Sequence, residues 1–312
     1  MYQKIDISFV IACYNSEKTI EKVIQEIAET VKKEQAYEII CVNDFSKDSV
    51  LDKLYDLRKD FQYLKIVNLA KNFGQHNALM AGFSLAQGNV VVVLDDDGQS
   101  PICEVYKLLE KINNGADVVI STTKDKKHGN LKLIGSKINE VMSHALIGTP
   151  KKMNFVPLYA FKQFICQEII KYKGSYPYII GLLYRTSTRI EYVEVIHRAR
   201  GIGKTNYTLN KLISLWLNGF TAFSVKPLRV ATLIGMLTAF AGFIYGIVIV
   251  FMKFFGHNYM LIGWSSLMAV LLFIGGMTMI FLGLIGEYIG RIYLNMNSMP
   301  QYVIREKTGF DD

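Results

Sequence analysis

Cysteine is scarce in this sequence: its 312 residues include four, at positions 13, 41, 103 and 166. No two of them have the short spacing of a metal-binding pair, so we expect buried free thiols. Basic residues are in excess, with a net charge of +8, but they do not alternate with aromatic residues as nucleic-acid-binding segments do. We therefore expect an anionic membrane surface, and not nucleic acid, to be the partner of this charge.

Charged residues are absent from two long apolar runs, residues 230–252 and 260–286. At about 1.5 Å per residue, the first run alone reaches about 34 Å, which is enough to cross a bilayer. The connector, residues 253–259, is too short to form a domain. This pattern predicts a two-helix transmembrane hairpin within residues 227–290, followed by a cytoplasmic tail at 291–312.

The charges that flank the two runs predict the topology. Lys226 and Arg229 precede the first run and Arg291 follows the second, which places both termini in the cytoplasm; Lys253 in the connector is a single opposing charge. No apolar leader segment precedes the first predicted strand. We expect a multi-pass protein of the inner (cytoplasmic) membrane with its catalytic part in the cytoplasm. A homo-oligomer is left open.

Residues 208–226 carry Leu209, Ile213, Trp216 and Phe220 at helical spacing. A core helix of a soluble domain would give the same pattern. The tryptophan, and the position just before the first apolar run, favour an amphipathic helix at the membrane interface.

Residues 1–207 alternate between apolar runs of strand length and helical patterns, which predicts one α/β domain with a mainly parallel sheet covered on both faces. Asn15 and Ser16 are expected to cap the first helix. We expect strands at residues 7–14, 37–43, 64–68, 89–94 and 118–121, and helices at 17–33, 50–59 and 75–87.

The strongest motif is Asp95-Asp96-Asp97-Gly98-Gln99, directly after the apolar run 89–94. Three adjacent carboxylates repel one another unless solvent or a cation separates them. In an extended segment Asp95 and Asp97 point the same way, so together they could hold one hard divalent ion with diphosphate oxygens. The alternative is a solvated acidic turn.

Two further groups follow neighbouring strands. Asp44 ends the run 37–43 and could accept a hydrogen bond from a nucleobase, although an aspartate in a turn is common for local reasons. Tyr14-Asn15-Ser16-Glu17 follows the first strand and could be a plain helix cap. The carboxyl ends of parallel strands share one sheet edge, where α/β folds bind ligands.

These motifs, with Asn72-Phe73-Gly74, resemble the family 2 glycosyltransferases of GT-A fold. The run from Arg200 to Tyr207 and the two terminal spans add a resemblance to polyisoprenyl-phosphate glycosyltransferases, such as dolichol- and undecaprenyl-phosphate sugar transferases. The resemblance implies a nucleotide-sugar donor and Mg²⁺ or Mn²⁺ between Asp95 and Asp97. It implies binding or catalytic roles for Ala12, Tyr14, Glu17, Asp44, Asp95, Asp96, Asp97 and Gln99, with acceptor phosphate at Arg198, Arg200 and Lys204.

The chain departs from that pattern around Asn154, where many relatives have an aspartate proposed as a base. A sugar hydroxyl needs such a base, whereas a lipid phosphate is already anionic near neutral pH and attacks without one. The departure favours a polyprenyl-phosphate acceptor. The basic loop 124–137 is read equally well as a phosphate-facing loop or a solvated surface.

The expected reaction is inverting transfer of a single hexose-type sugar from a nucleotide sugar, uridine-based by preference, to a polyprenyl phosphate, for cell-surface glycan synthesis or modification. Two alternatives stay open: a polysaccharide synthase of the same fold, and a catalytically inactive nucleotide-sugar-binding scaffold. A transporter is disfavoured, since two spans without internal charge offer no polar path.

Overall fold

The computed structural model describes residues 5–32, 35–123, 154–174, 177–196, 232–238, 240, 244, 247, 251, 264–296 and 300–310. The chain forms two compact units, one made of residues 1–212 with 298–312, the other of residues 213–297. Arg198, Arg200 and Lys204, the basic loop 124–137, the expected interfacial helix 208–226 and much of the first apolar run lie outside the described residues.

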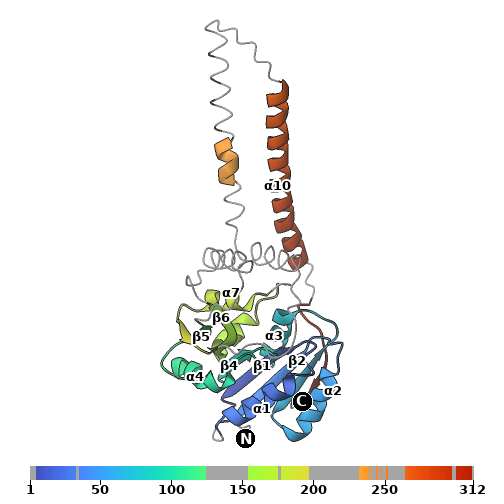
Figure 1. Cartoon of the computed structure of the whole chain (residues 1–312), viewed down its shortest axis with the longest axis vertical. Coiled ribbons are helices and arrows are strands. Elements are labelled where there is room, and N and C mark those ends of the chain that lie inside the picture. Colours follow the sequence, from blue (N-terminus) through green and yellow to red (C-terminus); the bar gives the residue numbers. More distant parts are fainter. Residues whose placement is uncertain are drawn as a thin grey trace. The chain divides into compact units, whose positions relative to one another are not determined.

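The first unit is built on an eight-stranded sheet of order β7-β5-β6-β4-β1-β2-β3-β8 (Figure 1). Four pairs are parallel, and three, β3 with β8 and β6 with both β4 and β5, are antiparallel. The predicted α/β class with a mainly parallel sheet is therefore confirmed. The strands are β1 Ile7–Cys13, β2 Tyr37–Asn43, β3 Leu64–Leu69, β4 Val90–Leu94, β5 Val118–Thr123, β6 Asn154–Lys162, β7 Ile190–Glu194 and β8 Ile304–Thr308.

Helices cover both faces of this sheet because successive residues of each strand point to opposite sides. The main core lies between one face, with Phe9 and Ile11, and the buried stripes of α1, α2 and α4. On the other face α3 approaches β1 so closely that a Cβ added at Gly82 would lie 2.4 Å from Val10 Cγ1. The helices are α1 Ile20–Thr30, α2 Val50–Asp60, α3 Gln75–Phe83, α4 Val105–Asn113, α6 Gln163–Ile169 and α7 Ile179–Thr186.

The first helix starts later than the capping pattern predicts. Helix α1 begins at Ile20, and no side chain caps its N-terminus. Asn15 has a φ of 55°, and its side-chain oxygen accepts a 2.8 Å hydrogen bond from the Lys47 N–H. The prediction that Asn15 and Ser16 cap the helix was wrong, because this left-handed backbone and the contacts to the next loop hold the segment out of the helix.

The C-terminal residues contribute a strand that the sequence pattern did not predict. Strand β8 pairs antiparallel with β3, in a register that shifts between Asn68 and Leu69. Beyond it the Phe310 ring lies under the Lys65 ammonium, 5.2 Å from the ring centroid. Part of the segment expected to be a tail is therefore an edge of the catalytic sheet.

The second unit contains α10, Trp264–Met296. Among the described residues this helix alone is long and apolar enough to cross a membrane, over the window Phe273–Gly290. It extends past the expected end of the second span at residue 286. Residues 232–238 of the first apolar run are also helical.

A buried ion pair lies near the amino ends of β1, β2 and β3. Glu38, 1% exposed, forms a 2.7 Å ion pair with Lys65 and accepts hydrogen bonds from the Ser8 hydroxyl and the Gln87 N–H. Removing one partner of such a pair leaves a buried charge without compensation, which costs far more than losing an exposed pair.

We expect Glu38→Ala to lower the free energy of unfolding by about 3 kcal/mol, because Lys65 loses its counter-charge. The matched control is Glu21→Ala, which breaks the partly exposed 2.6 Å pair with Lys53 and is expected to cost less than about 1 kcal/mol. Thermal unfolding of the full chain in detergent, followed by circular dichroism, measures both. Equal losses in the two variants would contradict the assignment.

Candidate donor-binding site

Three loops meet at the carboxyl edge of β1, β2 and β4. The Tyr14 N–H donates to Asp96 Oδ2 at 3.0 Å, which joins the β1 loop to the acidic motif after β4. The Asn15 N–H donates to Ser46 Oγ at 3.1 Å and joins the β1 and β2 loops. The structure therefore brings the three sequence motifs together, as the parallel strand order predicts.

Asp44 clamps a fourth loop to this edge. Its side chain is 2% exposed, and its two carboxylate oxygens accept hydrogen bonds from the Phe73 N–H at 2.7 Å and the Gly74 N–H at 2.8 Å. Burial raises the pKa of Asp44, and these two amides oppose that rise. The Asn72 side chain donates to the Asp44 carbonyl at 3.0 Å. Asp44 thus fixes the β3–α3 loop, a role that sequence reasoning did not foresee.

The clamp positions the start of α3. Gly74, with a φ of 87°, precedes the helix, and the Gln75 side chain donates to Asp95 Oδ1 at 2.8 Å. The next residue, His76, packs edge-on against the Tyr178 ring with centroids 5.6 Å apart, and burial lowers the pKa of His76 to about 4. The Gln75 amide therefore stands beside Asp95, and the neutral imidazole of His76 contacts Tyr178.

The aromatic wall of this region comes from β6 and the segment before α7. Burial raises the pKa of Tyr159, and the charge of Asp95 raises it further. The pKa of Tyr178 is also raised by burial. Both phenols therefore stay protonated at neutral pH and can donate hydrogen bonds.

The three aspartates of the motif differ in their surroundings. Asp96 is held inward: its Oδ2 accepts from Tyr14, and its carbonyl accepts from the Thr19 hydroxyl at 2.6 Å. Burial raises its pKa. All three aspartates are partly exposed, so the difference between them lies in their hydrogen bonds and not in their exposure. Asp96 is thus engaged by the β1 loop, and the role of Asp95 and Asp97 toward a ligand stays a prediction.

The motif itself is not extended. The chain turns at Asp96 and Asp97, Gly98 has a φ of 73°, and Asp97 Oδ1 accepts from the Gln99 N–H at 3.0 Å. The prediction placed Asp95 and Asp97 on one side because side chains alternate along an extended segment. That reasoning was wrong, because the strand ends at Leu94 and a local turn follows it.

The donor set suits a hard divalent cation. Mg²⁺ is commonly held by one or two protein carboxylates, with substrate phosphates completing its octahedron. Within the described ranges no three His, Cys, Asp or Glu side chains converge as a metal cluster. A cation held by Asp95 and Asp97 would take most of its remaining ligands from a diphosphate, so the residues present fit a shared protein–ligand site.

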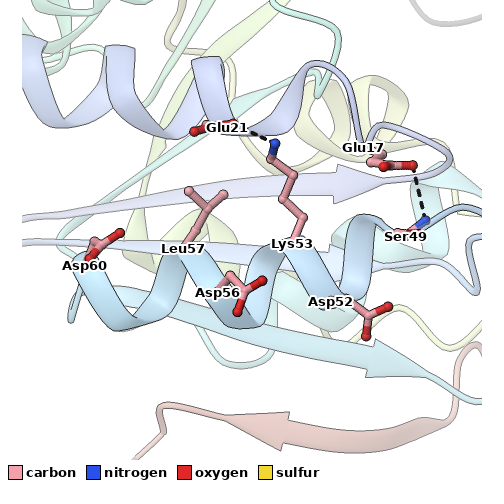
Figure 2. Close-up of a pocket in the computed structure, with 8 residues that line it drawn as sticks. All are labelled: Glu17, Glu21, Ser49, Asp52, Lys53, Asp56, Leu57 and Asp60. Carbon is pink, nitrogen blue, oxygen red and sulfur yellow. Dashed lines mark hydrogen bonds and ion pairs between the residues drawn. The ribbon is translucent and has the colours of Figure 1, made fainter.

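Glu17 lies on the opposite side of the β1 loop. Its N–H donates to Asp48 at 2.9 Å, and its carboxylate accepts from the Ser49 N–H at 3.4 Å. Glu17 also lines a concavity of about 390 Å³ between α1 and α2. Figure 2 shows its carboxylate bonded to the Ser49 N–H at one end of this concavity. The lining there is Glu17, Glu21, Ser49, Asp52, Lys53, Asp56, Leu57 and Asp60. None of Asp95, Asp96 and Asp97 lines this concavity, so we do not assign the donor to it.

The remaining predicted residues are placed as follows. Tyr14 is 47% exposed beside Asp96, and Ala12 is partly exposed near the end of β1. Asn154 begins β6 and pairs with Thr123 at the end of β5. Sequence reasoning missed Gln75, His76, Tyr159 and Tyr178 as neighbours of the site. The tertiary fold alone brings them there, although Gly74 signals the bend before α3.

The chain is similar to known glycosyltransferases. Residues 8–168, about half of the chain, match the family described as Glycosyl transferase family 2. Residues 226–292 match the GtrB C-terminal hairpin. The chain is 31% identical over its whole length to the uncharacterized glycosyltransferase YkcC of Bacillus subtilis, covering 97% of that protein.

A second relative is the undecaprenyl-phosphate 4-deoxy-4-formamido-L-arabinose transferase of Pectobacterium atrosepticum, 31% identical over 96% of this chain and 93% of the relative. Among solved structures, glucosyl-3-phosphoglycerate synthase from Mycobacterium tuberculosis aligns with a TM-score of 0.52 and 19% identity, over 69% of this chain and 77% of that one. At this identity the likeness bears on the fold alone, and it agrees with the GT-A class. The chain therefore belongs to glycosyl transferase family 2 and carries a C-terminal hairpin of the GtrB type.

Proposed function

We propose that this protein transfers one sugar from a uridine-based nucleotide sugar to a polyprenyl phosphate at the cytoplasmic face of the membrane, with inversion at the anomeric carbon. The observation that carries the proposal is the meeting of the Asp44 clamp and the Asp95–Asp97 carboxylates at one sheet edge, in a chain with a GtrB-type hairpin. A relative named as an undecaprenyl-phosphate sugar transferase, similar over nearly the full length, supports the acceptor class.

The class of donor is inferred from the carboxylates at the carboxyl edge of the sheet. Asp95 and Asp97 suit the Mg²⁺ or Mn²⁺ that accompanies a nucleoside diphosphate, and a bound cation would offset the charge of the leaving diphosphate. The synthase from Mycobacterium tuberculosis, which shares the fold, was crystallised in complex with Mn²⁺ and uridine diphosphate. We assign the nucleoside to the side of the edge with Ala12, Tyr14 and Asp44, and the sugar to the side with Gln75 and Tyr178. Glu17 was also expected to bind the donor, but it lines the separate concavity between α1 and α2, so it is left out of this assignment.

The class of acceptor is inferred from Asn154, the first residue of β6. Asn154 offers an amide where a base would otherwise be, and an amide cannot take a proton near neutral pH. An anionic phosphate oxygen can attack without that transfer. Arg198, Arg200 and Lys204, from the segment that precedes the hairpin in the sequence, are proposed to hold this phosphate.

The cation assignment predicts that Asp97→Asn loses turnover. The amide keeps the shape of the side chain but removes the charge, so we expect transfer to fall by two orders of magnitude or more, on the order of 3 kcal/mol of transition-state stabilisation. Asp60→Asn, in the acidic concavity, is the matched control and should keep full activity. Transfer of labelled sugar into extractable lipid measures both. Full activity of Asp97→Asn, or of the parent protein in EDTA, would disprove the assignment.

The acceptor assignment predicts that Arg200→Lys transfers sugar at least about tenfold more slowly, since lysine cannot form the two parallel hydrogen bonds that a guanidinium gives a phosphate. Affinity for the nucleotide sugar, measured by calorimetry, should change little. Arg189→Lys, exposed at the start of β7, is the control. Equal loss of donor affinity would mean that Arg200 binds the diphosphate of the donor. If neither the transfer rate nor the donor affinity falls, Arg200 would be assigned to the membrane surface.

A further inference from the structure

After the hairpin the chain returns to the first unit, which we call the catalytic unit from here on. Helix α10 ends at Met296, β8 begins at Ile304, and residues 298–312 belong to the same compact unit as residues 1–212. Just before β8, residues 301–303 make two hydrogen bonds to loops of that unit. We call these three residues the return segment. Its contacts lie on two loops that also reach the candidate donor site.

The first contact is to the β3–α3 loop, residues 70–74. The Ala70 N–H donates to the Val303 carbonyl at 2.9 Å. At the other end of the same loop, the N–H groups of Phe73 and Gly74 donate to the buried carboxylate of Asp44. The loop is therefore fastened at one end by the return segment and at the other by the site itself.

The second contact is to the segment between α6 and α7. The Gln301 side-chain amide donates to the Gly174 carbonyl at 2.6 Å. This segment continues to Tyr178, whose ring meets the edge of His76 beside Gln75. Gln75 in turn donates to Asp95. Gln301 thus bonds to the same connection between α6 and α7 that carries Tyr178.

We propose that Gln301 is a positioning residue for donor binding: through Gly174, and with the neighbouring Val303 carbonyl on Ala70, it holds in register the two loops that flank Asp44 and Asp95. This inference rests on the proposed function and deepens it. Gln301 touches no reacting atom and acts through the loops. Its consequence is that the donor site depends on chain that lies beyond the hairpin in the sequence.

The expected size of the effect follows from the bond. A single neutral hydrogen bond changes an equilibrium constant by roughly two- to tenfold once competition with water is included. Losing it frees the Gly174 segment, while β8 keeps its ladder with β3. We therefore expect looser loops and weaker donor binding without detachment of the strand.

The experiment uses the full chain in detergent. Gln301→Met keeps the length of the side chain and removes the donor, and Gln301→Lys restores a donor of similar reach. Lys307→Ala, exposed on β8, is the matched control. Hydrogen exchange is followed along β8 and at the Tyr172 and Leu182 amides, which flank the segment bonded by Gln301 and donate to Ile169 and Tyr178. Binding of uridine diphosphate with Mg²⁺ is measured by calorimetry.

We expect Gln301→Met to exchange faster at Tyr172 and Leu182, to bind uridine diphosphate about three- to tenfold more weakly, and to raise KM for the donor but not for the lipid. Gln301→Lys should recover most of this loss. Unchanged exchange or unchanged nucleotide affinity in Gln301→Met would overturn the proposal. So would loss of protection along β8 with both KM values raised together, because that outcome shows a general loosening of the sheet edge.

The failure of the proposed function is recognised separately. If the parent protein binds uridine diphosphate but transfers no sugar to a polyprenyl phosphate, the acceptor assignment is wrong, and a weaker nucleotide affinity in Gln301→Met still supports the positioning role. If the parent protein does not bind uridine diphosphate, the assigned nucleotide is wrong, and the positioning role falls with it.

Discussion

The arrangement of the candidate site depends on one buried charge. Asp44 is 2% exposed, so its carboxylate has exchanged water for the amides of Phe73 and Gly74. Those two bonds fix where the β3–α3 loop ends, and Gly74 adopts the φ of 87° that lets α3 start there. The first residue of α3, Gln75, then reaches Asp95. The position of the Asp95 side chain is thus tied, through three short steps, to the burial of Asp44.

An acidic centre in a basic protein sets the electrostatic problem that the site must solve. Burial raises the pKa values of Asp44 and Asp96, which means that the surrounding protein does not fully compensate their negative charge. An anionic diphosphate would meet repulsion here without a cation at Asp95 and Asp97. The basic residues that give the protein its net charge of +8 lie outside this acidic region. They include the arginines proposed to bind the acceptor phosphate.

The sequence allowed the strands of the site to be predicted because buried parallel strands are continuous apolar runs, and β2 has the predicted bounds of residues 37–43. Local backbone geometry was harder to predict. The left-handed Asn15 is held by a bond to the loop after β2, which forms only after folding. The turn at Asp97 is local, but its bond to the Gln99 N–H replaces the extended backbone that the prediction assumed. His76 and Tyr178 meet through tertiary packing that no spacing encodes. The roles of Arg198, Arg200 and Lys204 stay predictions from the sequence.

Strand β8 escaped prediction for a reason that bears on the whole protein. Its sequence, Ile-Arg-Glu-Lys-Thr, has the charged residues that keep a sheet edge from pairing with another chain, and so it lacks the apolar run of a central strand. Without β8, the edge of β3 would present unpaired N–H and C=O groups. The membrane hairpin is therefore an insertion in a catalytic unit that is discontinuous in sequence. Any shortened chain that ends before the hairpin would lose the edge strand as well as the anchor.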